Sequence, residues 1–366
     1  MSAASELSTG DLLGLTAELV DVESVSFAEG PLVELLETEL RSLGHLTVDR
    51  VGDNLVARTH LDRDLRLVLG GHTDTVPVNG NLPARLDGDV LWGCGSADMK
   101  GGLAVMLELA RSHREPAVDV TWIFYAREEV AADHSGLAEL IEVRPDLLAG
   151  DVAILGEPTT GDVEAGCQGV LRVSLTLTGA RAHTARAWMG RNAVHRLGAL
   201  LVALDDFEPR RPEIEGLRFH EALQATHVEA GVAGNVVPDR AVVRIAHRFA
   251  PDRTVEQAED WLRGFLAPFM EPGDELVVDD RSPAAWPALG HPVVRTLVGR
   301  NGLEVRSKLG WTDVARFTEL GVPAVNLGPG DSTLAHTRDE HVDRRSLERT
   351  YAALDDLLRN GPEDSR

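Results

Sequence analysis

Cysteine and positive charge are both scarce in this sequence. Cys94 and Cys167 are the only two cysteines among 366 residues. Two cysteines cannot build a disulfide framework, and their separation fits no zinc-ribbon spacing. The chain has 36 Lys and Arg against 59 Asp and Glu, a formal net charge of −23. This balance argues against a protein that binds nucleic acid or an anionic membrane surface, because both attract basic faces.

Long apolar runs are missing as well. No segment approaches the roughly 18 to 20 apolar residues that a membrane-spanning helix needs. The N-terminal residues show no basic start followed by an apolar stretch, so we expect no signal peptide and a cytoplasmic protein. Hydrophobic residues still make up 43% of the chain, which is enough for a sizeable core.

The order of helical and extended patterns predicts an α/β fold. In the first 170 residues, segments with helical spacing of apolar residues alternate with short apolar runs that indicate buried strands: 65–69, 120–125 and 152–155. This alternation is typical of a mixed, mostly parallel sheet flanked by helices.

A second pattern occupies residues 171–283. Its order, β-α-β-β-α-β, is that of a small ferredoxin-like α+β domain. After a linker at 284–290 the α/β pattern resumes. We therefore predict a discontinuous catalytic domain, residues 1–170 and 284–366, interrupted by an inserted lid domain at 171–283.

Polar residues directly follow each of the three predicted strands. His72 and Asp74 follow the first strand, Glu128 and Glu129 the second, and Glu157 the third. Such positions face the crevice in which α/β sheets bind ligands. Taken singly, each motif has an ordinary explanation, since a His-x-Asp pair can be a surface hydrogen bond and a Glu-Glu pair a solvated acidic loop.

Two further motifs complete the set. Asp98 lies in a glycine-rich segment that is neither a Walker A loop nor a dinucleotide-binding fingerprint, and alone it could be the N-cap of the next helix. His336 lies near the C-terminus. Together the five motifs supply two imidazoles and three carboxylates, a donor set suited to zinc or a similar divalent ion.

In order and local sequence these motifs resemble the M20 family of di-metal aminoacylases and peptidases, over nearly the whole chain. The resemblance implies two divalent metal ions, Zn²⁺ or else Co²⁺. Asp98 would bridge them, His72 and Glu157 would complete one site, and Glu129 and His336 would complete the other.

The family pattern also implies how the site works. Glu128 would be the general base, and Asp74 the partner that orients His72. With two metal ions that polarise the substrate, the reaction would be hydrolysis of an amide by water without a covalent intermediate.

Residues outside the predicted strand ends would bind the substrate. His183 corresponds to a family histidine that the partner subunit's lid brings to the active site to stabilise the oxyanion, which implies a homodimer through the lid domain. Asn235 and Arg248 correspond to a substrate-binding Asn and a carboxylate-binding Arg. Separately, the glycine-rich turn at Gly330 predicts backbone N–H groups that meet the substrate.

Segments 165–172 and 309–317 are most similar to succinyl-diaminopimelate desuccinylases of actinobacterial type. The resemblance implies hydrolysis of N-succinyl-LL-2,6-diaminopimelate to succinate and LL-2,6-diaminopimelate, a step of lysine and diaminopimelate biosynthesis. The alternative is an acetylornithine deacetylase, or a related N-acyl amino-acid hydrolase or carboxypeptidase. A more distant alternative is a non-catalytic binding homologue.

The sequence departs from this branch at the expected acyl-binding residues. Cys167 and Gln168 stand where well-known desuccinylases have consecutive arginines for the succinyl carboxylate. Lys308, Arg316 or Arg172 would then have to bind that carboxylate, or the acyl group is not succinyl.

Overall fold

The computed structural model describes residues 7–363, and the chain divides into two compact units. Unit 1 contains the residues up to Ala165, Ala288–Arg306 and the residues from Phe317 onward. Unit 2 contains Gly166–Pro287 and Ser307–Arg316. The segment Ser307–Arg316, which the sequence pattern places in the catalytic domain, thus groups with unit 2.

Unit 1 is built on an eight-stranded sheet with the order β1-β2-β6-β3-β7-β16-β8-β15. The strands are β1 (Thr47–Val51), β2 (Asn54–Arg58), β3 (Arg66–His72), β6 (Asp119–Tyr125), β7 (Val152–Leu155), β8 (Val163–Ala165), β15 (Val305–Ser307) and β16 (Ala324–Asn326). The central pairs β6-β3, β3-β7 and β7-β16 are parallel, whereas β1-β2, β2-β6 and β16-β8 are antiparallel. The predicted mixed sheet with a parallel centre is confirmed.

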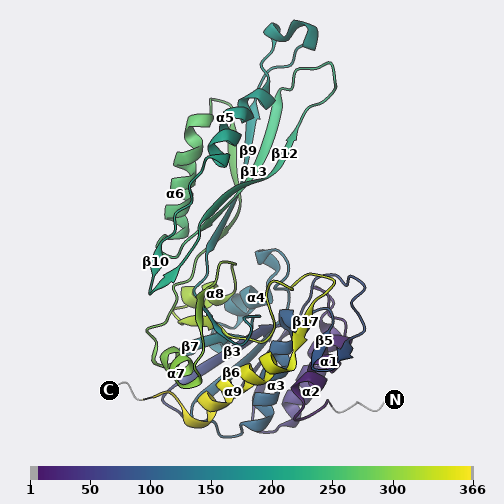
Figure 1. The fold of residues 1–366 in the computed structure, drawn as a ribbon, viewed down its shortest axis with the longest axis vertical. Helices are drawn as coiled ribbons and strands as arrows, with labels where there is room; N and C mark the ends of the chain where they lie inside the picture. Colours follow the sequence, from purple (N-terminus) through teal and green to yellow (C-terminus); the bar gives the residue numbers. More distant parts are fainter. Residues whose placement is uncertain (1–6, 364–366) are drawn as a thin grey trace. The chain divides into compact units, whose positions relative to one another are not determined.

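Helices and one small sheet surround these strands. The helices are α1 (Leu12–Asp21), α2 (Gly30–Ser42), α3 (Gly101–Ser112), α4 (Gly136–Val143), α7 (Pro292–Asn301) and α9 (Arg344–Asn360). Helix α8 (Val314–Glu319) begins in unit 2 and ends in unit 1. The small sheet has the order β17-β5-β4, formed by β4 (Arg85–Asp87), β5 (Val90–Trp92) and β17 (His341–Asp343). In Figure 1, α3 and α9 lie across one face of the large sheet.

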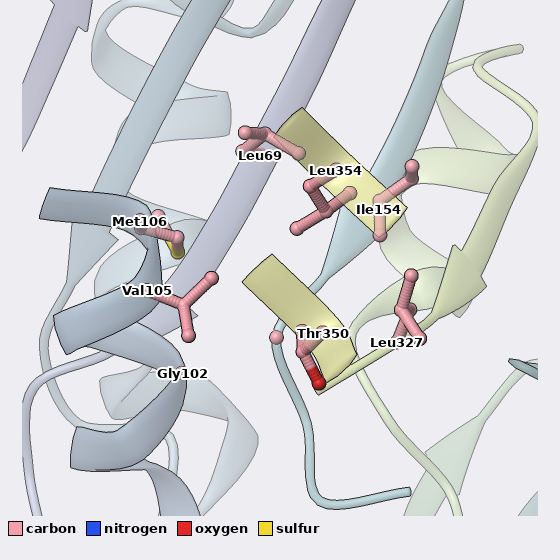
Figure 2. Close-up of a pocket in the computed structure, with 9 residues that line it drawn as sticks. Leu69, Gly102, Val105, Met106, Ile154, Leu327, Thr350 and Leu354 are labelled. Atoms are coloured by element: carbon pink, nitrogen blue, oxygen red, sulfur yellow. The ribbon is translucent and has the colours of Figure 1, made fainter. Parts of the chain in front are cut away.

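A small apolar cavity lies between α3, α9 and the strands they cover (Figure 2). Its lining includes Leu69 of β3, Val105 and Met106 of α3, and Leu354 of α9. Among residues 7–363, those that line the cavity carry no ionisable side chain. The cavity is therefore a feature of core packing with no chemistry of its own.

Unit 2 is a four-stranded antiparallel sheet covered by two helices. The sheet order β12-β13-β9-β14 comes from β9 (Gly169–Thr178), β12 (Ala222–Ala230), β13 (Arg240–Phe249) and β14 (Glu275–Ser282). Leucines of α5 (Ala193–Asp205) and α6 (Val255–Leu266) share one core with the strands, so both helices cover the same face. A short hairpin, β10 (Glu213–Ile214) and β11 (Leu217–Arg218), is added. This is the ferredoxin-like order that the sequence predicts.

Among residues 7–363, no helix combines the length and the apolar character that a membrane crossing requires.

Candidate metal centre

The predicted site residues of unit 1 lie where three neighbouring strands end. His72 is the last residue of β3, Glu128 and Glu129 follow β6, and Glu157 lies just beyond β7. Because β6, β3 and β7 are parallel neighbours, their carboxyl ends meet at one edge of the sheet.

Three overlapping groups of possible ligand atoms lie at this edge. Two of them contain Asp98, one with His72 and Glu157 and the other with Glu129 and His336, and the third contains His72, Glu128 and Glu129. Within each group the ligand atoms lie within 4.8 Å of one another. The structure thus brings together all five residues that the sequence predicts as ligands, with Asp98 common to two of the groups.

Two histidines contact the shared carboxylate. His72 Nε2 lies 3.1 Å from Asp98 Oδ1, while His336 Nε2 lies 3.5 Å from Asp98 Oδ2 and 2.7 Å from Glu129 Oε1. Burial would raise the pKa of Asp98, but hydrogen bonds from His336 and His72 outweigh it and lower that pKa. Hydrogen bonds to Asp98 and Glu129 in turn raise the pKa of His336 to about 10. The cluster attracts positive charge, and a divalent cation would supply that charge.

Asp74 contacts His72, as the sequence indicates, and makes further contacts that the sequence does not indicate. His72 Nδ1 lies 3.0 Å from the backbone oxygen of Asp74 and 3.5 Å from its carboxylate Oδ1. The carboxylate also accepts the backbone N–H groups of Glu128 (2.9 Å) and Glu129 (3.0 Å) and the hydroxyl of Ser26 (2.7 Å). Asp74 therefore contacts the imidazole through its backbone oxygen and its carboxylate, and it fixes the turn that carries both glutamates.

A second buried carboxylate supports the same turn. Glu29, which the sequence pattern did not single out, is fully buried and accepts the backbone N–H of Arg127 at 3.2 Å. Arg127 has a positive φ of 60°, so the chain bends sharply just before Glu128. Glu128 is half-buried, and one of its oxygens lies within 4.8 Å of ligand atoms of His72 and Glu129. Glu128 thus lies beside the cluster and belongs to neither group that contains Asp98.

The loop that carries Asp98 is held by Glu340, another residue that the sequence pattern did not single out. Its carboxylate accepts the backbone N–H groups of Gly95 (3.0 Å), Ala97 (3.0 Å) and Asp98 (3.1 Å). Burial raises the pKa of Glu340 to about 7, although these N–H groups act against that rise. In the sequence, the only indication of this role is that Glu340 lies four residues after the predicted ligand His336.

The turn at Gly330 is engaged within unit 1. Its φ is 81°, and an added Cβ would lie 2.8 Å from Ala97 Cβ, so the position requires glycine. Its N–H donates to Ser346 Oγ at 3.3 Å, and its carbonyl accepts the N–H of Thr160 at 2.7 Å. A contact of Gly330 with substrate stays a prediction.

Two predicted residues of unit 2 lie on adjacent loops. His183 is exposed and precedes the short helical turn Thr184–Met189, where its Nδ1 accepts the N–H of Ala185 at 3.0 Å. The N–H of Thr184 donates to the backbone oxygen of Asn235 at 3.0 Å, so the two loops are neighbours. Since Nδ1 of His183 is an acceptor, the neutral ring carries its proton on Nε2.

The third predicted residue of unit 2, Arg248, lies on the inner strand β13. Its Nη1 is buried and has no hydrogen-bond partner among residues 7–363. Burial, and then the nearby Arg172, lower the pKa of Arg248. A charge-assisted hydrogen bond to a carboxylate would give this nitrogen a partner.

The residues considered for a succinyl carboxylate differ in their contacts. Arg172 forms an ion pair with Asp280, and Arg316 forms one with Asp313 at 2.7 Å. Lys308 is 8% exposed. Gln168 donates its side-chain N–H to the backbone oxygen of His220 at 2.8 Å. This hydrogen bond joins two segments of unit 2.

Together, the strand-end cluster and the ferredoxin-like unit define a two-domain metallohydrolase. The chain belongs to the peptidase family M20/M25/M40, whose pattern matches residues 68–360. The family resemblance that the motifs indicated is confirmed.

Relatives of high identity come from actinobacteria. A Mycobacterium tuberculosis protein provisionally named succinyl-diaminopimelate desuccinylase DapE is 48% identical, over 96% of this chain and 97% of that protein. A Corynebacterium glutamicum protein named succinyl-diaminopimelate desuccinylase is 42% identical, over 97% of this chain and 99% of that protein.

Solved structures share the fold at lower identity. Aminopeptidase PepT from Bacillus cereus matches with a TM-score of 0.77 and 20% identity, over 96% of this chain and 98% of that chain. The Bacillus subtilis protein YXEP, described as a dinuclear metal binding peptidase of the M20 family, matches with a TM-score of 0.64 and 18% identity, over 93% of this chain and 95% of that chain.

Proposed function

We propose that this chain is a metal-dependent succinyl-diaminopimelate desuccinylase. It hydrolyses N-succinyl-LL-2,6-diaminopimelate to succinate and LL-2,6-diaminopimelate, on the route to diaminopimelate and lysine. The observation that carries the proposal is the similarity, over nearly the whole chain, to two actinobacterial relatives named for this activity.

The two groups of ligand atoms that contain Asp98 fit two divalent ions, Zn²⁺ in the first place and Co²⁺ as the alternative. Imidazole nitrogens and carboxylate oxygens suit both ions. Three carboxylates meet at the cluster, and two of them, Asp98 and Glu129, raise the pKa of His336, so the site favours positive charge. Bound ions polarise the amide carbonyl and lower the pKa of a water molecule.

Within this site Glu128 acts as the general base. It takes a proton from the attacking water and delivers it to the leaving amine. Its backbone N–H, held by Asp74 at 2.9 Å, keeps the carboxylate beside the cluster. Because Glu128 is in neither group that contains Asp98, it can exchange protons without loss of those ligands.

Unit 2 supplies the groups that handle the substrate. The Nε2–H of His183 is a donor for the oxyanion that forms on the carbonyl. The buried Nη1 of Arg248, without a partner among the described residues, suits a substrate carboxylate, and Asn235 on the loop next to His183 adds a polar contact.

We also propose that unit 2 is a lid and dimerisation domain, so that His183 reaches the active site of the partner subunit. Two features of its surface support a homodimer. Strand β12 is at the edge of the sheet, and α5 exposes Val202 (61%), Val194 (38%) and Leu201 (37%). Pairing of two β12 edges, with the apolar side chains of α5 packed together, would cover both features. A cytoplasmic location stays a prediction.

Parallel hydrolysis assays test the substrate. The Zn²⁺-loaded protein is given N-succinyl-LL-2,6-diaminopimelate and N-acetylornithine, and we expect faster turnover of the succinyl compound. Faster turnover of acetylornithine would overturn the desuccinylase proposal and leave amide hydrolysis standing. No turnover of either compound, with metal bound, would favour a binding protein.

A further inference from the structure

We propose that Glu340 is a positioning residue of the metal centre, which fixes the loop that carries Asp98 and ties it to the segment that carries His336. Of the proposed function, this inference requires only that the cluster binds metal ions.

Four hydrogen bonds join Glu340 to this loop. Carboxylate Oε1 accepts the N–H groups of Ala97 and Asp98, and Oε2 accepts the N–H of Gly95. The backbone oxygen of Glu340 accepts the N–H of Gly93 at 3.1 Å. The side chain is 2% exposed, so water does not compete for these contacts.

These contacts place Glu340 next to the predicted ligand Asp98 and outside the two groups that contain Asp98. Both of its carboxylate oxygens are engaged by backbone N–H groups, and it belongs to neither group that contains Asp98. One of those N–H groups is that of Asp98 itself, so the position of the shared ligand depends directly on Glu340. A displaced Asp98 would weaken both groups, because it contributes to both.

Glu340 also links distant parts of the chain. It directly precedes β17, which pairs with β5, and β5 leads into the Asp98 loop. His336 lies four residues earlier in the same segment. The side chain therefore sets the geometry between a ligand from the first part of unit 1 and a ligand from its last part.

The variant Glu340→Gln tests the role. Its amide NH₂ would face one of the backbone N–H donors, so the loop must shift. We expect the affinity for Co²⁺, measured by titration against a competing chelator, to fall about 10- to 100-fold, as for other residues that orient metal ligands. The visible absorption of bound Co²⁺ should change too, because it reports ligand geometry.

Asp119→Asn is the matched control. Asp119 is 3% exposed and accepts the N–H groups of Leu61 and Arg63 and the hydroxyl of Thr59, but it begins β6, at the opposite end of the strand from Glu128. This variant should lose stability and keep its Co²⁺ affinity. A Glu340→Gln protein whose Co²⁺ affinity and spectrum match those of Asp119→Asn would overturn the proposal.

If Glu340→Gln does not fold, a second variant tests the same proposal. Glu340→Asp keeps the charge and withdraws the carboxylate by one methylene, and the same criteria apply to it. Co²⁺ affinity is measured without turnover, so an inactive wild-type protein would overturn the substrate assignment and leave this test unaffected.

Discussion

The two units hold their predicted functional residues in opposite ways. In unit 1 the side chains leave the ends of buried strands, and buried carboxylates such as Asp74 and Glu340 fix the loops that carry them. In unit 2, His183 and Asn235 are exposed, and Arg248 has a buried nitrogen with no partner among the described residues. The predicted site residues of unit 1 are thus held by contacts within the unit, whereas those of unit 2 make few such contacts.

The largest expected effect concerns the base in unit 1. Glu128→Ala should lower turnover by about 10²- to 10⁴-fold, because a positioned general base contributes that much. The metal content, measured by elemental analysis, should stay at the wild-type value. Asp133→Ala changes an exposed side chain of the same loop and is the control. Wild-type turnover in Glu128→Ala would refute its role as base.

The next effect is in unit 2. His183→Ala should lower turnover by about 10²- to 10³-fold, as expected when one oxyanion donor is removed, without loss of metal. His60→Ala, at an exposed histidine of unit 1, is the control and should be close to wild type.

A mixed dimer tests whether His183 acts on the partner subunit. Coexpressed Glu128→Ala and His183→Ala chains should recover about a quarter of wild-type activity, because half of the dimers are mixed and each mixed dimer has one intact site. If His183 served its own subunit, no intact site would form and activity would stay at the level of the single variants.

A smaller effect is expected for the buried arginine. Arg248→Met should raise KM by about 10- to 100-fold, since a hydrogen bond to a charged group contributes roughly 1.5–3 kcal/mol. The melting temperature should not fall, because no described residue loses a hydrogen bond to its Nη1. Arg244→Met, on the exposed part of the same strand, is the control. An unchanged KM would contradict the assignment of a substrate carboxylate to Arg248.

The smallest effect is on stability and comes from His247 of unit 2. Burial, and then Arg253 and Arg210, lower its pKa to about 4, and its ring lies 4.7 Å from that of Trp261. The unfolded chain therefore binds more protons than the folded chain between about pH 6.5 and pH 4, so stability falls as the pH falls through this range. Between pH 7 and pH 5.5 we expect His247 to lower the free energy of unfolding by about 1 kcal/mol.

The variant His247→Leu should remove this dependence. Denaturant unfolding at both pH values measures the difference from wild type, with His195→Leu as an exposed control on α5. An equal loss of stability in wild type and His247→Leu would contradict a neutral buried imidazole.

The sequence was informative where periodicity and position act together. Apolar runs predict β3, β6 and β7, and the carboxyl ends of parallel strands meet at one edge, so His72, Glu129 and Glu157 could be placed side by side. Asp98 and His336 depended more on the family resemblance, because neither follows a strong strand pattern.

The residues that support the loops of the site could not be predicted in this way. Glu29 and Glu340 act through contacts with backbone N–H groups far along the chain, and such contacts leave no periodic mark on the sequence. The carboxylate of Asp74 contacts His72, as the sequence indicates, but its hydrogen bonds to the turn after β6 could not be predicted. The grouping of Ser307–Arg316 with unit 2 is likewise a long-range property.

The hydrogen bond from the N–H of Asp98 to Glu340 spans 242 positions of sequence. The whole of Gly166–Pro287 lies between these two residues. During synthesis on the ribosome, the Asp98 loop cannot form its hydrogen bonds to Glu340 until unit 2 and the segment beyond it have been synthesised. A metal ion captured earlier would meet at most four of the five ligands, since His336 follows the insertion too. A cluster with all five predicted ligands can therefore form only after the residues beyond Gly166–Pro287 have been synthesised.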